Sequence, residues 1–260
     1  MRRNNLKISG SFLWLLYWVL IHSSMGAASD LIIDAAKQGN ISEVKRLVTQ
    51  GTDIQFSDEF MMTPLHHAAY RARYDVVAYL IKIGANVNAR NKAQETPLHL
   101  CAQDFKSEQR VEVASLLINN KADVNATSKG GETPLHYAAY YGYSELIDLL
   151  IANGAKINTR EIDIGATPFH KATPVSKWDV CRPGVLRQLA RYGAEVNATI
   201  SENGDSALHL AAFSGHVACV EVLLDLGANP KMKNKFGETP LDNAKAKGHT
   251  DVIKILEKSE

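Results

Sequence analysis

Residues 133–139 read TPLHYAA, and the first four of them recur along the chain. Copies or near copies begin at Thr63, Thr96, Thr133, Thr167, Ser206 and Thr239. The intervals between them are 33, 37, 34, 39 and 33 residues. Self-similarity at this period indicates a stacked array of repeats. Chains of this kind usually act by presenting a surface, so the sequence directs attention to binding before turnover.

One period predicts a finger, two short helices and a stop. Thr is a favourable helix N-cap, and Pro at the next position has its φ angle preset for the first turn. The alanine pair at residues 138–139 lets neighbouring helices approach closely, and the apolar stripe at residues 76–81 of a second helix needs a neighbouring unit to cover it. Gly, as at Gly84, supplies the left-handed turn that ends the helix, whereas the third unit has Lys121 there.

This pattern resembles the ankyrin repeat family over about residues 30–260. The resemblance implies an all-α repeat fold, in which L-shaped units of two antiparallel helices and a β-hairpin finger stack into a curved solenoid. An opening unit without the tetrapeptide can be placed by register, which gives about seven units. The expected bounds are 30–62, 63–95, 96–132, 133–166, 167–205, 206–238 and 239–260. The last unit ends in lysines and a glutamate, the polar outer face of a capping repeat.

Residues 1–28 differ in kind from the repeats. A basic start (Arg2, Arg3, Lys7) precedes the apolar run FLWLLYWVLI at residues 12–21, and small residues follow. This is the pattern of a signal peptide, with cleavage after Gly26 or Ala28. The run is shorter than the roughly 18 residues of a membrane-spanning helix. We therefore expect residues 29–260 to be secreted or periplasmic; a retained N-terminal membrane anchor is the alternative.

Charge argues against broad binding to nucleic acid. Without residues 1–28 the chain has 26 Lys and Arg against 28 Asp and Glu, a net charge of −2. Electrostatic recognition of nucleic acid needs a basic stripe, which this balance does not supply. We expect a protein partner, a monomeric chain, no cofactor, and contact with a membrane only if the N-terminal segment is retained.

The three cysteines predict no disulfide framework. Cys101 takes an alanine position of a first helix, and Cys219 a valine or isoleucine position of a second helix, so both are expected to be small core residues. Cys181 lies in an insertion, where we expect a thiol that is exposed and either free or paired with another molecule.

Most of the nine histidines follow the repeat. Five are the fourth residue of the tetrapeptide: His66, His99, His136, His170 and His209. Helices in successive units lie about 8–10 Å apart, which is too far for shared zinc ligation at about 2.0–2.1 Å. We interpret these imidazoles as hydrogen-bonding groups at the helix starts. The sequence contains no catalytic or phosphate-binding motif, so a non-enzymatic function without metal is expected.

Three sequons match the N-glycosylation pattern. Those at Asn125 and Asn197 belong to a repeated Val-Asn step at the finger start, where we expect the asparagine to bond to backbone. The sequon at Asn40 lies in a turn and is expected to be better exposed. Whether any of them carries a glycan stays open, because the exporting cell type is not written in the sequence.

Two insertions between first and second helices account for the long intervals. They lie near residues 104–108 and within residues 174–184. The unit between them keeps a short turn that contains three tyrosines. Insertions of this kind often mark the binding face of a repeat array, so we expect an aromatic notch on the edge opposite the fingers. Its residues are Phe105 and Trp178 as walls and Tyr140, Tyr141 and Tyr143 as floor. The rival interpretation is that the loops fold back and bury these rings.

A second candidate surface is the concave face, which ankyrin proteins most often use. The matching positions are His67, Tyr70, Arg71, Tyr137, Lys171, Leu210 and Phe213. We interpret the chain as a protein-binding module of an exported ankyrin-repeat protein, of the type that bacteria secrete or direct at a host. The alternative is a membrane-anchored or periplasmic structural scaffold that keeps its apolar N-terminus.

Overall fold

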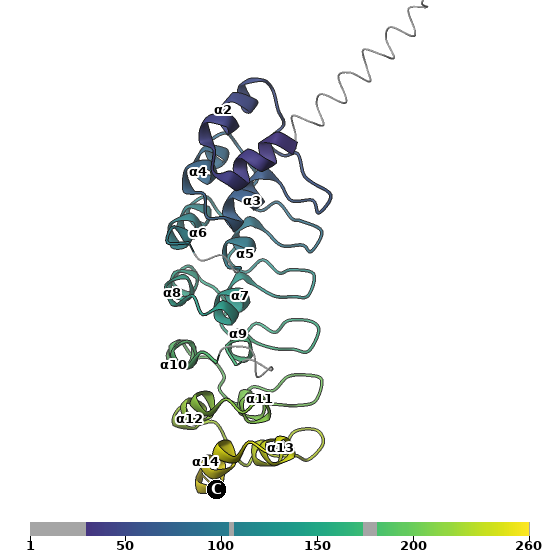
Figure 1. Ribbon diagram of the computed structural model, residues 1–260, viewed down its shortest axis with the longest axis vertical. Helices are drawn as coiled ribbons and strands as arrows, with labels where there is room; N and C mark the ends of the chain where they lie inside the picture. Colours follow the sequence, from purple (N-terminus) through teal and green to yellow (C-terminus); the bar gives the residue numbers. More distant parts are fainter. Residues whose placement is uncertain (1–29, 104–106, 174–180, 260) are drawn as a thin grey trace, which may run out of the picture.

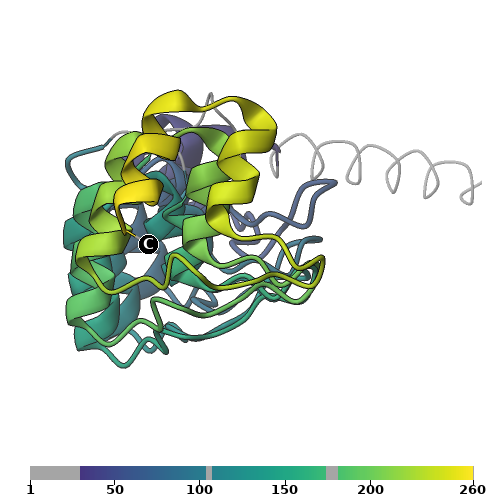
Figure 2. The ribbon, with the colours of Figure 1, turned by 90° about the horizontal axis from the view of Figure 1, so that it is seen from below.

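The computed structural model describes residues 30–103, 107–173 and 181–259, which form an elongated stack of helix pairs (Figure 1). The described residues contain no β-strand, and the fingers hold a single isolated bridge, between Thr199 and Ser206. The expected all-α repeat solenoid is therefore confirmed, with fingers that are turns more than hairpins. The fingers project together from one side of the stack (Figure 2).

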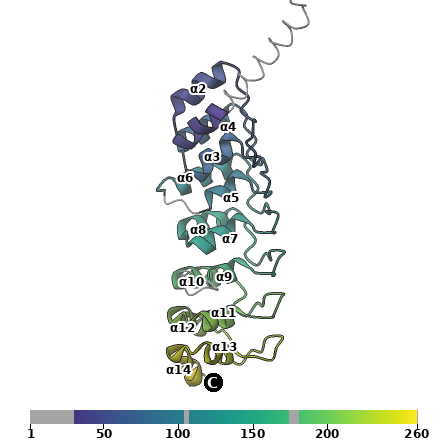
Figure 3. The ribbon, with the colours of Figure 1, turned by 45° about the vertical axis from the view of Figure 1, so that its right-hand side comes forward.

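The helices form two parallel rows, visible in Figures 1 and 3. The inner row, next to the fingers, contains α3 (Pro64–Tyr70), α5 (Pro97–Cys101), α7 (Pro134–Tyr141), α9 (Pro168–Lys171), α11 (Ala207–Ser214) and α13 (Pro240–Lys247). The outer row contains α2 (Ile41–Thr49), α4 (Tyr74–Lys82), α6 (Arg110–Asn119), α8 (Ser144–Ala152), α10 (Pro183–Arg191), α12 (Val217–Asp225) and α14 (Thr250–Ser259). Residues 30–38 are also helical and belong to the opening unit.

Each tetrapeptide starts an inner helix, and its histidine holds two units together. In the third unit Nδ1 of His99 accepts from the Thr96 amide at 3.1 Å, while Nε2 donates to the Glu132 carbonyl of the next finger at 3.1 Å. The other four copies make the same pair of bonds. All five imidazoles are buried. The structural interpretation of these histidines is confirmed.

A ladder of asparagines joins the fingers in the same way. The Asn125 side chain donates to the Gly154 carbonyl at 2.9 Å and accepts from the Lys156 amide at 2.8 Å. Asn197 repeats this geometry with the next unit, at Gly227 and Asn229. The expected backbone bonding of both sequon asparagines is confirmed. Asn40 is exposed and caps α2 by accepting from the Glu43 amide.

One continuous core runs between the helix rows, from Ile32 near the start of the array to Leu256 near its end. The alanine pairs of the inner helices, such as residues 138–139, are completely buried, which is what lets adjacent inner helices approach. Lys121 takes the left-handed conformation (φ 69°) that glycine adopts at the equivalent helix ends. The core therefore depends on stacking between units, as the repeat pattern predicts.

The prediction for two of the cysteines was wrong. Cys181 and Cys219 form a disulfide, with their Cα atoms 6.0 Å apart, that ties the start of α10 to the middle of α12. Cys219 is buried, as its register indicated, but the insertion brings Cys181 back onto the neighbouring unit instead of into solvent. Cys101 is a buried free thiol, as expected. An odd cysteine count thus concealed one intramolecular pair.

Candidate functional site

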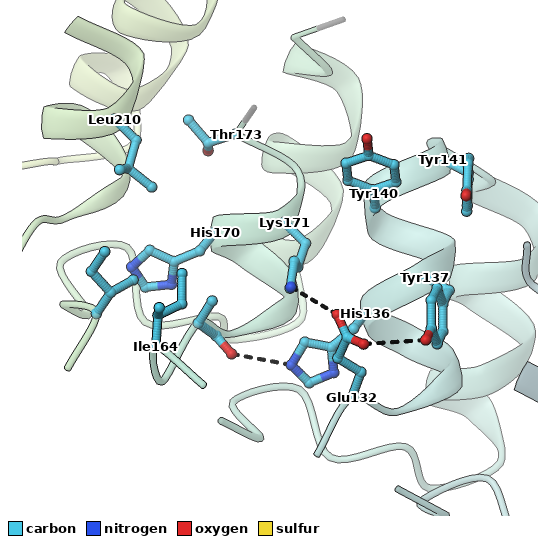
Figure 4. A pocket seen from close by; sticks show the side chains of 12 residues that line it. Glu132, His136, Tyr137, Tyr140, Tyr141, Ile164, His170, Lys171, Thr173 and Leu210 are labelled. Carbon is cyan, nitrogen blue, oxygen red and sulfur yellow. Dashed lines mark hydrogen bonds and ion pairs between the residues drawn. The ribbon is translucent and has the colours of Figure 1, made fainter. Parts of the chain in front are cut away.

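The inner helix of the fifth unit is half as long as its neighbours. Helix α9 has four residues, whereas α7 and α11 have eight each. The sequence explains the early end, because Pro174 follows Thr173 and disfavours helical backbone in the residue before it. Where a second turn of α9 would lie, the surface between α7 and α11 contains a hollow of about 270 Å³ (Figure 4).

Apolar side chains from three units line this hollow. Ile164 and Ala166 come from one finger, Ile200 from the next finger and Leu210 from α11. These four residues form a small hydrophobic cluster separate from the main core. The hollow therefore presents an apolar patch on the face made by the inner helices and fingers, which is the concave face of the sequence analysis.

A polar network borders the apolar patch. The Tyr137 hydroxyl lies 2.9 Å from Oε1 of Glu95 and 3.2 Å from Oε2 of Glu132. The other oxygen of Glu132 receives a bond from the Lys171 ammonium at 2.8 Å (Figure 4). Burial, followed by the charges of the two carboxylates, raises the pKa of Tyr137. The phenol therefore stays protonated and acts as a donor at neutral pH.

The three tyrosines of the expected notch do not act together. Tyr140 and Tyr141 meet edge to face at 5.0 Å and line the inner hollow. Tyr143 stacks on Tyr141, but its ring lies 3.6 Å beneath the Arg110 guanidinium and packs on the core. Two of the tyrosines thus border the concave face instead of forming a floor opposite the fingers. Phe105 and Trp178, the expected walls, lie outside the described residues.

The remaining concave candidates lie away from the hollow. His67 is buried, with Nε2 2.8 Å from the Asp58 carboxylate, and burial lowers its pKa. The Arg71 guanidinium lies 5.4 Å from the ring centroid of Tyr70 in the same unit. Phe213 is exposed on α11, with the Lys247 ammonium 4.3 Å from its ring. These residues remain predictions as partner contacts, and the buried His67 offers a partner the least surface.

Of the candidate residues, the structure brings Tyr137, Lys171, Tyr140, Tyr141 and Leu210 to one place. Sequence reasoning missed the two glutamates and the finger isoleucines that complete it. A signal for the isoleucines was present, because Ile164 and Ile200 occupy finger positions that polar residues usually take.

The described residues offer no metal centre and no membrane-crossing helix. No group of three or more His, Cys, Asp or Glu side chains is gathered closely enough to hold an ion within residues 30–103, 107–173 and 181–259. Within the same ranges, no helix is both long enough and apolar enough to cross a bilayer. What the inner hollow can do chemically is bury an apolar group and accept hydrogen bonds on its carboxylate rim.

Known proteins resemble this chain over most of its length. Models for ankyrin repeats (3 copies) match residues 32–128 and 178–260, and one for ankyrin repeats (many copies) matches residues 117–172. A Danio rerio protein named for palmitoyltransferase activity, ZDHHC13, is 30% identical over 214 residues, which are 82% of this chain and 32% of that protein. The Mus musculus B-cell lymphoma 3 protein homolog is 27% identical over 224 residues, which are 85% of this chain and 49% of that protein. The chain thus spans half or less of these relatives' lengths.

Solved structures agree with the fold. The human ASB11 ankyrin repeat domain superposes with a TM-score of 0.74 at 26% identity, covering 88% of this chain and 97% of that one. The ankyrin repeat domain of Bcl-3, described as a unique member of the IkappaB protein family, superposes with a TM-score of 0.69 at 30% identity and covers 87% and 97%. Ankyrin repeats are in general non-enzymatic scaffolds that bind other proteins, although relatives such as ZDHHC13 carry further domains. This chain belongs to the ankyrin repeat family and is a protein–protein interaction module.

Proposed function

We propose that this chain is the binding module of an exported ankyrin-repeat protein, and that its partner docks on the inner hollow without being chemically changed. The observation that carries the proposal is the hollow itself, which exists because α9 ends after Lys171. Ordinary units fill this position with a second helical turn. The shortened unit therefore distinguishes one part of an otherwise repetitive face, and aromatic residues of the kind enriched at interface hot spots border it.

Two observations support export. Residues 1–28 have the basic start, apolar run and small residues of a signal peptide. The Cys181–Cys219 disulfide is a bond that persists in secreted and periplasmic proteins and is rare in the cytosol. A bacterial protein that is secreted or acts on a host fits this combination of an ankyrin array with an export signal.

Site-directed cross-linking tests the docking surface. A photo-reactive amino acid replaces Tyr140, which borders the hollow and is 40% exposed. The matched control replaces Tyr192, which is 45% exposed at the end of α10 in the outer row. We expect a protein adduct from position 140 and none from position 192 when cells that export the chain are irradiated. Equal adducts from both positions, or adducts from 192 alone, would place the binding surface elsewhere.

N-terminal sequencing of the exported chain tests the localisation. A start between Ala27 and Asp30 is the expected result for a free secreted or periplasmic domain. Recovery of the intact N-terminus in the membrane fraction would instead support the anchored scaffold. Alkylation before and after reduction supplies a second measurement, because an exported chain should expose two additional thiols only after reduction.

A further inference from the structure

We propose that the hollow receives a segment of the partner protein that presents one large apolar side chain beside a lysine or arginine. The inference rests on the proposed function and adds the chemistry of the partner to it. It depends on the size of the hollow, on its lining and on the charge of its rim.

The volume of the hollow favours a side chain over a small ligand. Pockets for small molecules usually measure about 300–1,000 Å³, and this one measures about 270 Å³. Its open side faces outward between α7 and α11 (Figure 4). A single branched or aromatic side chain that reaches from a partner's surface can fill such a space, and burying it against Ile164, Ile200 and Leu210 would be favourable.

The rim calls for positive charge. A phenol has one proton to donate, so Tyr137 satisfies Glu95 or Glu132 at one moment but not both. The shorter distance is to Glu95, which leaves Oε2 of Glu132 3.2 Å from a hydroxyl oxygen whose proton points elsewhere. A donor from the partner would bridge these oxygens. Two carboxylates against the single ammonium of Lys171 make the network negative, so the matching donor is cationic.

The two recognition elements are adjacent on the surface. Glu132 and Tyr137 both line the hollow, and they also form the network (Figure 4). The side chain of Glu132 is 27% exposed, so a cation can reach it from solvent. Neighbouring residues of one partner segment can therefore supply the apolar group and the cation together.

Selection from a random displayed-peptide library, with the full exported chain as bait, tests this chemistry. We expect selected peptides to carry an apolar residue next to Lys or Arg. Ile164→Glu should abolish their binding, whereas Ile162→Glu, at a 74%-exposed position of the same finger, should leave it unchanged. Glu132→Gln should weaken binding about tenfold and remove its salt dependence, as loss of a hydrogen bond between charged groups predicts. Glu202→Gln, on an exposed finger, is the charge control.

The outcomes separate the two proposals. If Ile164→Glu abolishes binding but the peptides show no preference for basic residues, the hollow is the site and the cationic partner is wrong. If the peptides are acidic, or if Glu132→Gln strengthens binding, the charge argument is overturned. Peptides that bind the Ile164→Glu variant as well as the wild type would overturn both the docking surface and the partner chemistry. Circular dichroism of each variant establishes that it is folded.

Discussion

The third and fifth units begin identically and end differently. In both, a histidine accepts from the threonine amide at the helix start and bonds a carbonyl of the next finger. The insertion of the third unit follows α5, a helix of five residues, and that of the fifth follows α9, a helix of four. Only the fifth unit borders the inner hollow and is cross-linked to its neighbour. Helix starts therefore specify the array, and helix ends distinguish its members.

The largest expected effect breaks what all regular units share, the neutral histidines. Burial lowers the pKa of His66, His99, His136 and His170 to about 4, whereas an unfolded histidine titrates near 6.5. Because the pKa is depressed in the folded state, the stabilisation is complete above about pH 6.5 and is lost as pH falls towards 4. Each histidine then contributes up to about 1.4 kcal/mol per pH unit, or roughly 5 kcal/mol per pH unit for the four.

Acid titration followed by circular dichroism at 222 nm measures this loss. We expect helix content to collapse between about pH 6 and pH 4, before ordinary carboxylates become protonated. The terminal unit, which has Asp242 in place of the histidine, has no such group to titrate in this window. A chain that keeps its full helix content down to pH 4 would contradict the assignment of these imidazoles as buried and neutral.

The second effect removes the feature that sets the fifth unit apart. The Cys181–Cys219 bond closes a loop with a sequence separation of 38 residues, for which loss of the cross-link costs about 2–4 kcal/mol. Cys181→Ser should lower the melting temperature, and hydrogen exchange should accelerate in α9 to α12 more than in α3 to α7. Reductant should destabilise the wild type and leave Cys181→Ser unchanged, since Cys101 is a buried free thiol. Equal melting of wild type with and without reductant would argue against the bond.

The sequence predicted the parts of this structure that depend on local chemistry. The caps at residues such as Thr96, the role of His99, the backbone bonds of Asn125 and the left-handed turn at Lys121 each follow from a residue and its near neighbours. Repetition made these predictions safer, because each was read from several copies.

The features that sequence reasoning missed depend on where distant segments meet. Cys181 pairs with Cys219 because the chain before α10 returns to α12, and no local preference specifies that path. The network at the hollow joins Glu95 to Tyr137 across a separation of 42 residues. The tyrosines were correctly identified as unusual, but the periodicity alone did not say that Tyr140 would face the fingers while Tyr143 packed inward.

A smaller effect is expected from the asparagine ladder, which joins units in the regular part of the stack. Asn125→Ala removes a bond to the Gly154 carbonyl and another from the Lys156 amide. Loss of two net hydrogen bonds at an exposed site should cost roughly 1–2 kcal/mol. Asn125→Asp keeps the acceptor and loses the donor, so chemical denaturation should show a smaller loss. If both variants unfold at the wild-type midpoint, the ladder follows the packing of the units without stabilising it.

The smallest expected effect restores a regular feature to an irregular unit. Ala207 takes the first helical position of α11, where the other inner helices have proline. Its predecessor Ser206 has φ −86° and ψ 170°, close to the −95° and 167° of Thr96 before Pro97. Extended backbone before proline is what its ring requires, and the amide at this position has no partner within the helix. Ala207→Pro should therefore stabilise the chain by about 0.4–1 kcal/mol through reduced entropy of the unfolded state.

Thermal melting measures this gain, with Ala212→Pro as the control inside the same helix. The control should lose about 3 kcal/mol or more, because an interior proline removes a helical hydrogen bond and clashes with the preceding turn. A gain at Ala207 would mean that the tetrapeptide can be restored without affecting the hollow beside Leu210. A loss there would mean that packing around the hollow already requires the smaller alanine, and that the departure from proline belongs to the site.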